Sequence, residues 1–226
     1  MIKAVVFDIE GTIGDIAFVR DVLFPFARTR LHNFFESQWN GVELRDILSD
    51  ARRESGLTLQ CPDEAAKLFE SWIDADKKIT QLKSLQGLIW RKGYKSGELK
   101  AHLYPDAVEA FKRYTAADHR LCIYSSGSIE AQKLYLTHSI AGDLTSYFTD
   151  YFDTTTGPKA DRDSYNKIAN SISLAPQEIA FFSDARAEIG AASEAGFTAI
   201  HVVRDAVATG VPAFHTINSF AEISKL

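Results

Sequence analysis

The sequence predicts an α/β fold, in which a Rossmann-like parallel-sheet core carries an inserted α-helical domain. An apolar segment opens the chain, and apolar segments alternate with helical patterns again after Pro105, as expected of parallel strands joined by helices. The stretch between these two parts shows helical periodicity only. We therefore expect residues 1–13 and 101–226 to form the core, and residues 14–100 to form the inserted domain.

The first expected strand, residues 5–7, ends on two acids. Asp8 follows the apolar residues directly, and Glu10 lies two positions later. Open α/β sheets bind ligands at the carboxyl ends of their strands, so both acids should face one cleft. Two neighbouring acids repel unless one binds a divalent cation or the other holds a proton, which corresponds to a metal-bound nucleophile or a general acid. Gly11 permits a sharp turn after the strand, and Thr12 can brace it.

A strand followed by an acidic turn without any catalytic role would have the same residues, so this segment alone does not identify an active site. Later segments of the chain are therefore needed. A second strand is expected at residues 121–124, and it ends on Ser125 and Ser126. Their hydroxyl groups, together with the N–H groups at the start of the next helix, can hold an anion. Serine before a helix is commonly an N-cap, so this segment alone decides little.

Lys159 and Asp184 complete the set of charged residues near expected strand ends. Lys159 follows a Gly-Pro turn and precedes a helix expected from about Asp161. A lysine there is unfavourable for the helix dipole, but it would balance a phosphate and an aspartate. The strand at residues 179–182 is followed by Asp184, and Glu188 lies one helical turn later. Two acids near one helix start can hold a cation.

Four helices are expected in the inserted domain, because apolar residues recur there at helical spacing. Proline at first-turn positions and glycine after the last turns mark their ends. The expected ranges are residues 26–39, 42–54, 63–78 and 80–92. Helices of this length can form a small bundle.

The return from the inserted domain to the core is rich in glycine and polar residues. This segment makes Lys95, Lys100 and His102 candidates to lie over the cleft. Trp90 and Tyr94, near the same hinge, are candidates to contact an apolar substrate tail. Helical periodicity explains the other aromatic residues of the domain as core.

The strand ends bear, in chain order, Asp with Glu, then Ser, then Lys, then Asp, and this ordered set resembles the four motifs of the haloacid dehalogenase superfamily of aspartate-nucleophile phosphotransferases. More narrowly, DIEGT, DVLFPFAR, IYSSGSIEAQKL and FFSDARAEI are similar to segments of the enolase-phosphatases of methionine salvage, and the similarity runs along nearly the whole chain. Most relatives in the superfamily have a second aspartate where this chain has Glu10. The chain departs from the usual pattern in the loop at Ile13 and at Ala101, where a glycine is expected.

The resemblance implies a core of the haloacid dehalogenase type with a helical cap, and a bifunctional activity. The expected substrate is 2,3-diketo-5-methylthiopentyl-1-phosphate. Enolisation and hydrolysis of an aspartyl phosphate would convert it to phosphate and acireductone, which is 1,2-dihydroxy-3-keto-5-methylthiopentene. The base for the enolisation is not identified by the resemblance.

Each motif residue has an expected role in that reaction. Asp8 would be the nucleophile, and Glu10 would be the general acid and then the general base. The phosphate would be bound by Ser125, Ser126 and Lys159. The expected cofactor is Mg²⁺, with an Asp8 oxygen, the backbone carbonyl of Glu10 and Asp184 as its ligands. Glu188 would be an outer acid of that site.

The composition excludes several other classes of protein. A formal net charge of −5 and the lack of a basic run argue against nucleic-acid binding. No apolar stretch reaches the roughly 18 residues that a membrane span requires. Cys61 and Cys122 lack C-x-x-C spacing and are expected to be reduced. We therefore expect a cytoplasmic monomer that acts on a small phosphorylated molecule, without nucleic-acid or membrane partners.

Three alternatives fit the same residues. The chain could hydrolyse another small phosphorylated metabolite with the same chemistry. It could be a dehalogenase, but Glu10 counts against this because a halide leaves without an acid. It could also be a phosphate-binding module without turnover.

Overall fold

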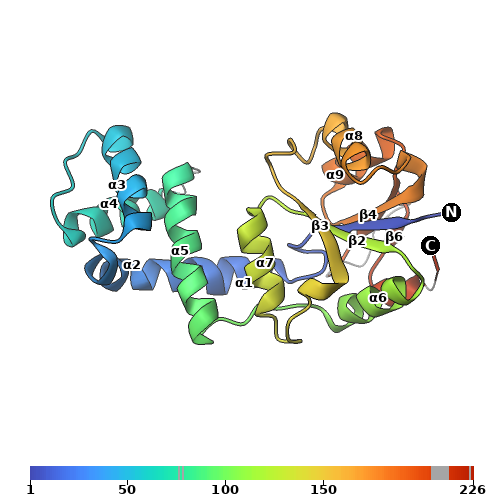
Figure 1. The fold of residues 1–226 in the computed structure, drawn as a ribbon, viewed down its shortest axis with the longest axis horizontal. Coiled ribbons are helices and arrows are strands. Elements are labelled where there is room, and N and C mark those ends of the chain that lie inside the picture. The colour runs from blue at the N-terminus through green and yellow to red at the C-terminus, as the bar shows by residue number, and fades with distance from the viewer. Residues whose placement is uncertain (76, 78, 205–213, 224) are drawn as a thin grey trace. The chain divides into compact units, whose positions relative to one another are not determined.

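The computed structural model describes residues 1–75, 77, 79–204, 214–223 and 225–226. The chain divides into two compact units, shown in Figure 1. An α/β unit is formed by Met1–Ile16 and Lys100–Leu226, and a helical unit is formed by Ala17–Leu99. The expected inserted domain, residues 14–100, spans nearly the same part of the chain as the helical unit. Its assignment as a substrate-covering cap stays a prediction.

The α/β unit is built on a parallel sheet whose described strands number six, in the order β3-β2-β1-β4-β5-β6. In chain order the strands are β1 (Ala4–Phe7), β2 (Arg120–Tyr124), β3 (Phe148–Phe152), β4 (Ile179–Ser183), β5 (Thr198–Val202) and β6 (Thr216–Ile217). The predicted α/β fold class is confirmed. The strand order changes direction between β1 and β4, and ligands of open α/β sheets bind at such a point.

Alternation of side chains along β1 divides the core of this unit between two faces of the sheet. Val6 packs in a buried cluster with Tyr165 and Ile189. Phe7 points to the other face, where its ring centroid lies 5.2 Å from that of Phe111. The helices that supply these partners are α6 (Pro105–Ala116), α8 (Arg162–Ser171) and α9 (Arg186–Glu194), and α7 (Ile129–Thr137) follows β2. Because both faces are covered, β1 is apolar along its whole length.

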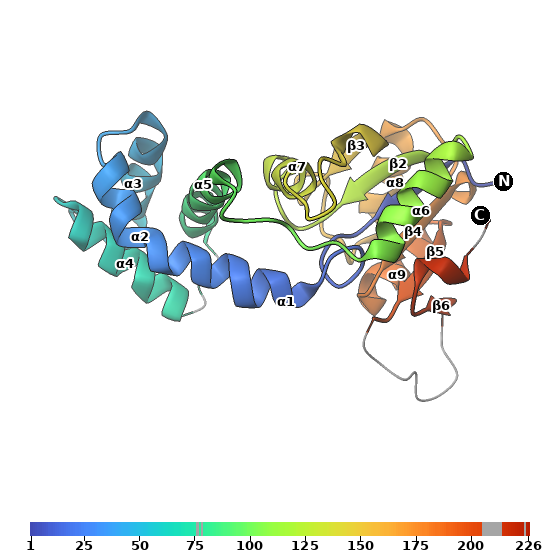
Figure 2. The ribbon, with the colours of Figure 1, turned by 90° about the horizontal axis from the view of Figure 1, so that it is seen from below.

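The helical unit has a hydrophobic core of its own. Its described helices, drawn in blue to green in Figure 2, are α1 (Ile16–Phe18), α2 (Phe24–Gln38), α3 (Val42–Ser55), α4 (Pro62–Asp74) and α5 (Thr80–Ser96), with a π-helical turn, η1 (Val19–Leu23), between α1 and α2. Phe69 lies at the centre of this core, with ring centroids 5.5 Å from Phe35 and 4.8 Å from Trp72. Burying an aromatic side chain of this kind contributes about 1.5–3 kcal/mol.

The four expected helices of this unit are confirmed, with shifts at their ends. Helical structure begins at Ile16 rather than near Phe26, which the sequence patterns did not predict. The third helix ends at Asp74, and the expected end at Lys78 lies outside the described residues. The fourth continues to Ser96, where a left-handed glycine follows it.

Two further expectations concern cysteine and the membrane. Cys61 and Cys122 are free thiols. Burial raises the pKa of the Cys122 thiol to about 12, so little thiolate forms at neutral pH. None of the helices in the described ranges is long and apolar enough to cross a bilayer.

Candidate active site

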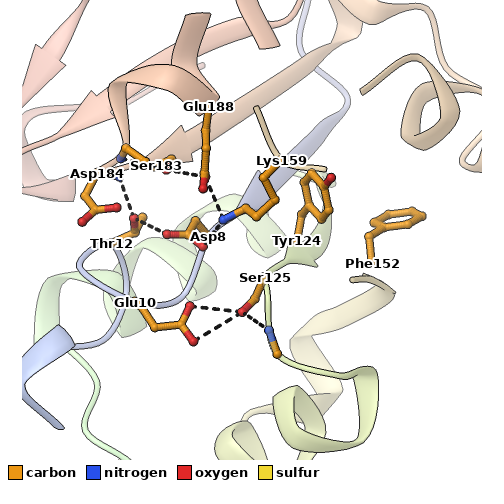
Figure 3. Close-up of polar contacts among 12 residues, drawn as sticks. Asp8, Glu10, Thr12, Tyr124, Ser125, Phe152, Lys159, Ser183, Asp184 and Glu188 are labelled. Carbon is orange, nitrogen blue, oxygen red and sulfur yellow. Dashed lines mark hydrogen bonds and ion pairs between the residues drawn. The ribbon is translucent and has the colours of Figure 1, made fainter. Parts of the chain in front are cut away.

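Polar residues from neighbouring strand ends meet at one edge of the sheet of the α/β unit (Figure 3). Asp8 and Glu10 follow β1, Ser125 follows β2, and Asp184 follows β4. Lys159 lies in the segment between β3 and α8. Because the strands are parallel, their carboxyl ends all lie at the same edge of the sheet. The structure thus brings together five of the predicted site residues.

The Asp8 carboxylate is buried and is held at both of its oxygens. Only 3% of the residue is exposed. Oδ1 accepts a hydrogen bond from Lys159 Nζ at 2.5 Å, and Oδ2 accepts one from Thr12 Oγ1 at 3.1 Å. These two bonds orient the carboxylate and place a positive charge against one oxygen.

Lys159 is shared between two acids. Its Nζ lies 2.5 Å from Asp8 Oδ1 and 2.7 Å from Glu188 Oε2. Glu188 also accepts a hydrogen bond from Ser183 Oγ at 2.8 Å. The sequence spacing suggested Glu188 as an outer acid near Asp184, whereas its carboxylate contacts Lys159. Helical spacing indicates which residues of α9 share a face with Glu188, but it cannot reveal that Lys159, from the segment between β3 and α8, is its partner.

Burial and neighbouring charges shift the pKa values in this site. Burial raises the pKa of Asp8 to about 8, although Lys159 opposes the rise. Burial alone would lower the pKa of Lys159, but Asp8 and Glu188 outweigh it and raise that pKa, so the lysine stays charged. Burial, followed by the charge of Glu188, raises the pKa of Asp184. Acids with raised pKa values mark a site where added positive charge would favour their ionised forms.

The loops that follow β1 and β4 touch each other at Gly11 and Thr12. Thr12 Oγ1 donates to Asp8 and accepts a hydrogen bond from the Asp184 amide at 3.0 Å. Gly11 has a φ of +72°, and any Cβ at this position would collide with the Asp184 carboxylate. Glycine therefore serves both the left-handed turn and the close approach of Asp184 to the main chain beside Glu10.

Glu10 and Ser125 face each other across the site. The half-buried Glu10 carboxylate accepts a hydrogen bond from Ser125 Oγ at 3.1 Å. The cap of α7 is Ser128, whose hydroxyl accepts from a main-chain amide of the first helical turn. The predicted anion-binding serines are therefore not the N-cap of this helix. Ser125 is buried, while Ser126 beside it is exposed.

The oxygen atoms of this site fit a divalent cation of the Mg²⁺ type. Asp8 and Asp184 follow adjacent strands, and Asp184 packs against the turn that carries the Glu10 carbonyl. Mg²⁺ prefers oxygen ligands and keeps several waters, so two carboxylates and one carbonyl suffice. No three His, Cys, Asp or Glu side chains form a complete ligand group within the described ranges, so main-chain oxygen and water would complete the coordination.

The candidates from the hinge segment divide between the two units. His102 Nδ1 accepts a hydrogen bond from the Asp15 amide at 3.2 Å, and its ring meets that of Tyr104 edge-on at 5.0 Å. Lys100 is exposed. The remaining candidates belong to the helical unit and are Trp90, Tyr94 and Lys95. The expected placement of Lys95, Lys100 or His102 over the cleft stays a prediction, as does the expected contact of Trp90 and Tyr94 with an apolar substrate tail.

Known proteins resemble this chain over most of its length. Residues 2–196 match the haloacid dehalogenase-like hydrolase family. The chain is 46% identical to Enolase-phosphatase E1 of Aquifex aeolicus, with 99% of each chain covered. It is 49% identical to Enolase-phosphatase E1 of Alcanivorax borkumensis, with 87% of each chain covered. This chain belongs to the enolase-phosphatase family.

Solved structures share the fold of this chain. The UTR4 protein of Saccharomyces cerevisiae superimposes with a TM-score of 0.83 at 30% identity, covering 99% of this chain and 100% of that one. L-2-haloacid dehalogenase of Xanthobacter autotrophicus, at 20% identity and a TM-score of 0.57, shares the fold and covers 98% of this chain and 96% of its own. As an enolase-phosphatase, the chain is a phosphatase enzyme of the haloacid dehalogenase-like hydrolases.

One residue near the site, Arg204, was not identified from the sequence. Arg204 lies two residues beyond the end of β5 and donates to the carbonyl of Thr12. Arg204 is a polar residue just after an apolar strand, as Asp8, Ser125 and Asp184 are. The same sequence signal therefore predicts a site residue at this position.

Proposed function

We propose that the chain converts 2,3-diketo-5-methylthiopentyl-1-phosphate to acireductone and phosphate in methionine salvage. Membership of the enolase-phosphatase family supports this reaction. The observation that carries the proposal is the buried Asp8 carboxylate, which is oriented by Lys159 and Thr12 and faces the acid Glu10 across the site. Phosphoryl transfer requires mainly such positioning and charge compensation.

Asp8 is the proposed nucleophile. One of its oxygens attacks phosphorus, the bond from phosphorus to the substrate oxygen breaks, and an aspartyl phosphate forms. Lys159 supports this role, because its charge favours the ionised form of Asp8 over the protonated form that burial favours. Thr12 supports it by holding the other oxygen in place.

Glu10 is the proposed general acid and base. It donates a proton to the leaving substrate oxygen, and afterwards it takes a proton from the water that cleaves the aspartyl phosphate. Its carboxylate lies on the loop that follows Asp8 and accepts a hydrogen bond from Ser125 Oγ, which places it beside the proposed phosphate site.

The phosphate oxygens are proposed to bind Ser125, Ser126 and Lys159. Ser125 lies at the end of β2 beside Glu10, and Ser126 follows it with an exposed hydroxyl. Lys159 would compensate the negative charge of both the phosphate and Asp8. Glu188 is proposed as a positioning residue, since its carboxylate also contacts Lys159 Nζ, at 2.7 Å.

The proposed cofactor is Mg²⁺, held by Asp8, the carbonyl of Glu10, Asp184 and water. When bound, this ion would supply positive charge to the phosphate and to the enolate of the first step. Asp184 is oriented for this role by its amide, which donates to Thr12. We further propose that the helical unit covers the substrate, and that the enzyme is a cytoplasmic monomer.

The test follows both steps of the reaction at once. The protein is incubated with the diketo phosphate and Mg²⁺, while enol absorbance and free phosphate are recorded together. We expect the enol signal to rise and phosphate to follow. Phosphate release without an enol product, or activity on other small phosphate esters only, would overturn the enolase half of the proposal. No phosphate release from any ester would overturn the phosphatase half.

The enolisation base is tested with a second substrate. Lys100→Ala and His102→Ala are assayed with the diketo phosphate and with a simple phosphate ester that needs no enolisation. We propose that these variants lose more activity on the first substrate. Equal losses on both would remove Lys100 and His102 from the enolisation step.

A further inference from the structure

Arg204 is a largely buried arginine whose guanidinium group holds the loop that carries the site acids. Its side chain is 9% exposed. Nε and Nη2 both donate to the carbonyl oxygen of Thr12, at 3.0 and 2.7 Å. Nη1 donates to Asp106 Oδ2 at 2.7 Å. The guanidinium carbon lies 4.1 Å from the ring centroid of Tyr104, which adds a cation–π contact.

Thr12, the residue that Arg204 holds, contacts both of the aspartates proposed to bind the metal ion. Thr12 donates its hydroxyl to the Asp8 carboxylate and accepts from the Asp184 amide. Thr12 is fully buried, so its main chain and its side chain are fixed together. A shift of its carbonyl would move its hydroxyl away from Asp8 and Asp184 at the same time.

We propose that Arg204 is a positioning residue that fixes Thr12 and thereby sets the orientation of Asp8 and Asp184. The inference rests on the proposed function, because it assigns Asp8 as the nucleophile. Arginine suits the position since its planar fork gives Thr12 two N–H donors and Asp106 a third, whereas lysine offers one compact charge that cannot span both partners.

A purely structural role is the competing explanation. Asp106, the partner of Arg204, also accepts hydrogen bonds from the Ser219 hydroxyl and the Phe220 amide, so Arg204 could serve only to dock the C-terminal segment. Arg113 provides a matched control for this explanation. It donates to the carbonyls of Phe220 and Ile223 at 2.9 and 3.0 Å and lies over the ring of Tyr114.

The experiment compares Arg204→Lys with Arg113→Lys in the full chain. Phosphate release from a simple phosphate ester with Mg²⁺ gives kcat and KM, and circular dichroism gives the thermal midpoint. We expect Arg204→Lys to lose between about tenfold and ~10²-fold in kcat with KM within about twofold of the parent, as for a misplaced catalytic group. Arg113→Lys should keep its kcat, even where its thermal midpoint falls. Equal kcat losses in the two variants, or a parent-like kcat in Arg204→Lys, would overturn the proposal.

A double-mutant cycle tests whether Arg204 acts through Thr12. In a Thr12→Ala background the hydroxyl that contacts Asp8 is already missing. The fold-loss in kcat caused by Arg204→Lys should therefore be less than half as large in this background as in the parent chain. Full additivity of the two losses would overturn the route through Thr12.

The Asp8→Asn variant separates this inference from the proposed function. An active Asp8→Asn variant would defeat both the proposed function and the positioning role of Arg204. An inactive Asp8→Asn variant together with parent-like kcat in Arg204→Lys would defeat only the positioning role.

Discussion

The burial of the Asp8 carboxylate is unfavourable for its charge, but the contacts that compensate it also orient this single side chain for reaction. A buried carboxylate beside other acids tends to take up a proton, and burial does raise the pKa of Asp8. Lys159 at Oδ1 and Thr12 at Oδ2 hold the side chain in one orientation. A group that is oriented in advance loses little entropy when it attacks.

Asp8→Asn is expected to abolish phosphate release, because an amide is a poor nucleophile and a poor ligand for a cation. The measurement is phosphate release with saturating substrate and Mg²⁺. Asp118→Asn, at an exposed loop position, is the control and should keep parent activity. Residual activity of Asp8→Asn within about tenfold of the parent, a barrier change of only ~1.4 kcal/mol, would contradict the nucleophile assignment.

Glu10→Gln is expected to lower turnover by about 10² to 10⁴ while substrate affinity changes little. Glutamine keeps the shape of the side chain and can still accept the hydrogen bond from Ser125, but it cannot transfer a proton. Steady-state kinetics separate the two effects. A raised KM with an unchanged kcat would instead make Glu10 a binding residue.

At the scale of one element, the turn after β1 depends on a glycine. Gly11→Ala should reduce stability by about 1–2 kcal/mol, because alanine is strained at a positive φ. It should also reduce activity, because its Cβ would collide with the Asp184 carboxylate. Gly56→Ala is the matched control, since Gly56 has the same φ of +72° and open space around it. We expect a similar stability loss there with parent kcat; parent kcat in Gly11→Ala would contradict the close packing of Asp184.

The helices of the inserted unit depend on their own core. Phe69→Ala is expected to lower the free energy of unfolding by about 3–5 kcal/mol, since Phe69 is fully buried against Phe35 and Trp72. Urea unfolding followed by circular dichroism measures the change. Leu57→Ala, at a position that is 53% exposed, should change it by less than about 0.5 kcal/mol. A small effect of Phe69→Ala would show that this core contributes little to stability.

Strand ends were predictable because apolar runs stop where polar residues begin. Asp8, Ser125 and Asp184 follow such runs, and the parallel sheet brings them together. β6 was not predictable, since Thr216–Ile217 is too short to show alternation. The start of the helical unit was missed because Pro25 resembles a first-turn residue. A π-helical turn precedes it, at the point where proline cannot continue the usual hydrogen-bond ladder.

At the scale of the whole molecule, Asp106 joins parts of the chain that are far apart in sequence. It accepts hydrogen bonds from Arg204, Ser219 and the Phe220 amide. Burial on its own would raise the pKa of Asp106, but these hydrogen bonds together outweigh burial and hold the pKa below its ordinary value. The partners that determine this network lie too far apart for any local pattern to predict it.

Asp106→Asn is therefore expected to lower the free energy of unfolding by about 1–3 kcal/mol at neutral pH. An acid whose pKa is lowered on folding stabilises the folded state above its unfolded pKa of about 3.9, and that contribution is lost as the pH falls through the lower folded value. The difference between parent and variant should thus shrink when urea unfolding is repeated from pH 7 towards pH 3. A difference that stays constant with pH would show that the carboxylate charge is not what stabilises this network.

The position of β1 in the sheet also governs when the enzyme can first work during its synthesis. β1 leaves the ribosome well before its two neighbours in the sheet, because Ala4 pairs with Arg120 on one side and with Ile179 on the other. Contacts of such long range form slowly. Until they form, the apolar segment of β1 has no partner in the sheet and is a point of aggregation risk. Asp8 acquires its orientation only when the last of these strands has docked, so nascent chains that end before Asp184 should be catalytically silent.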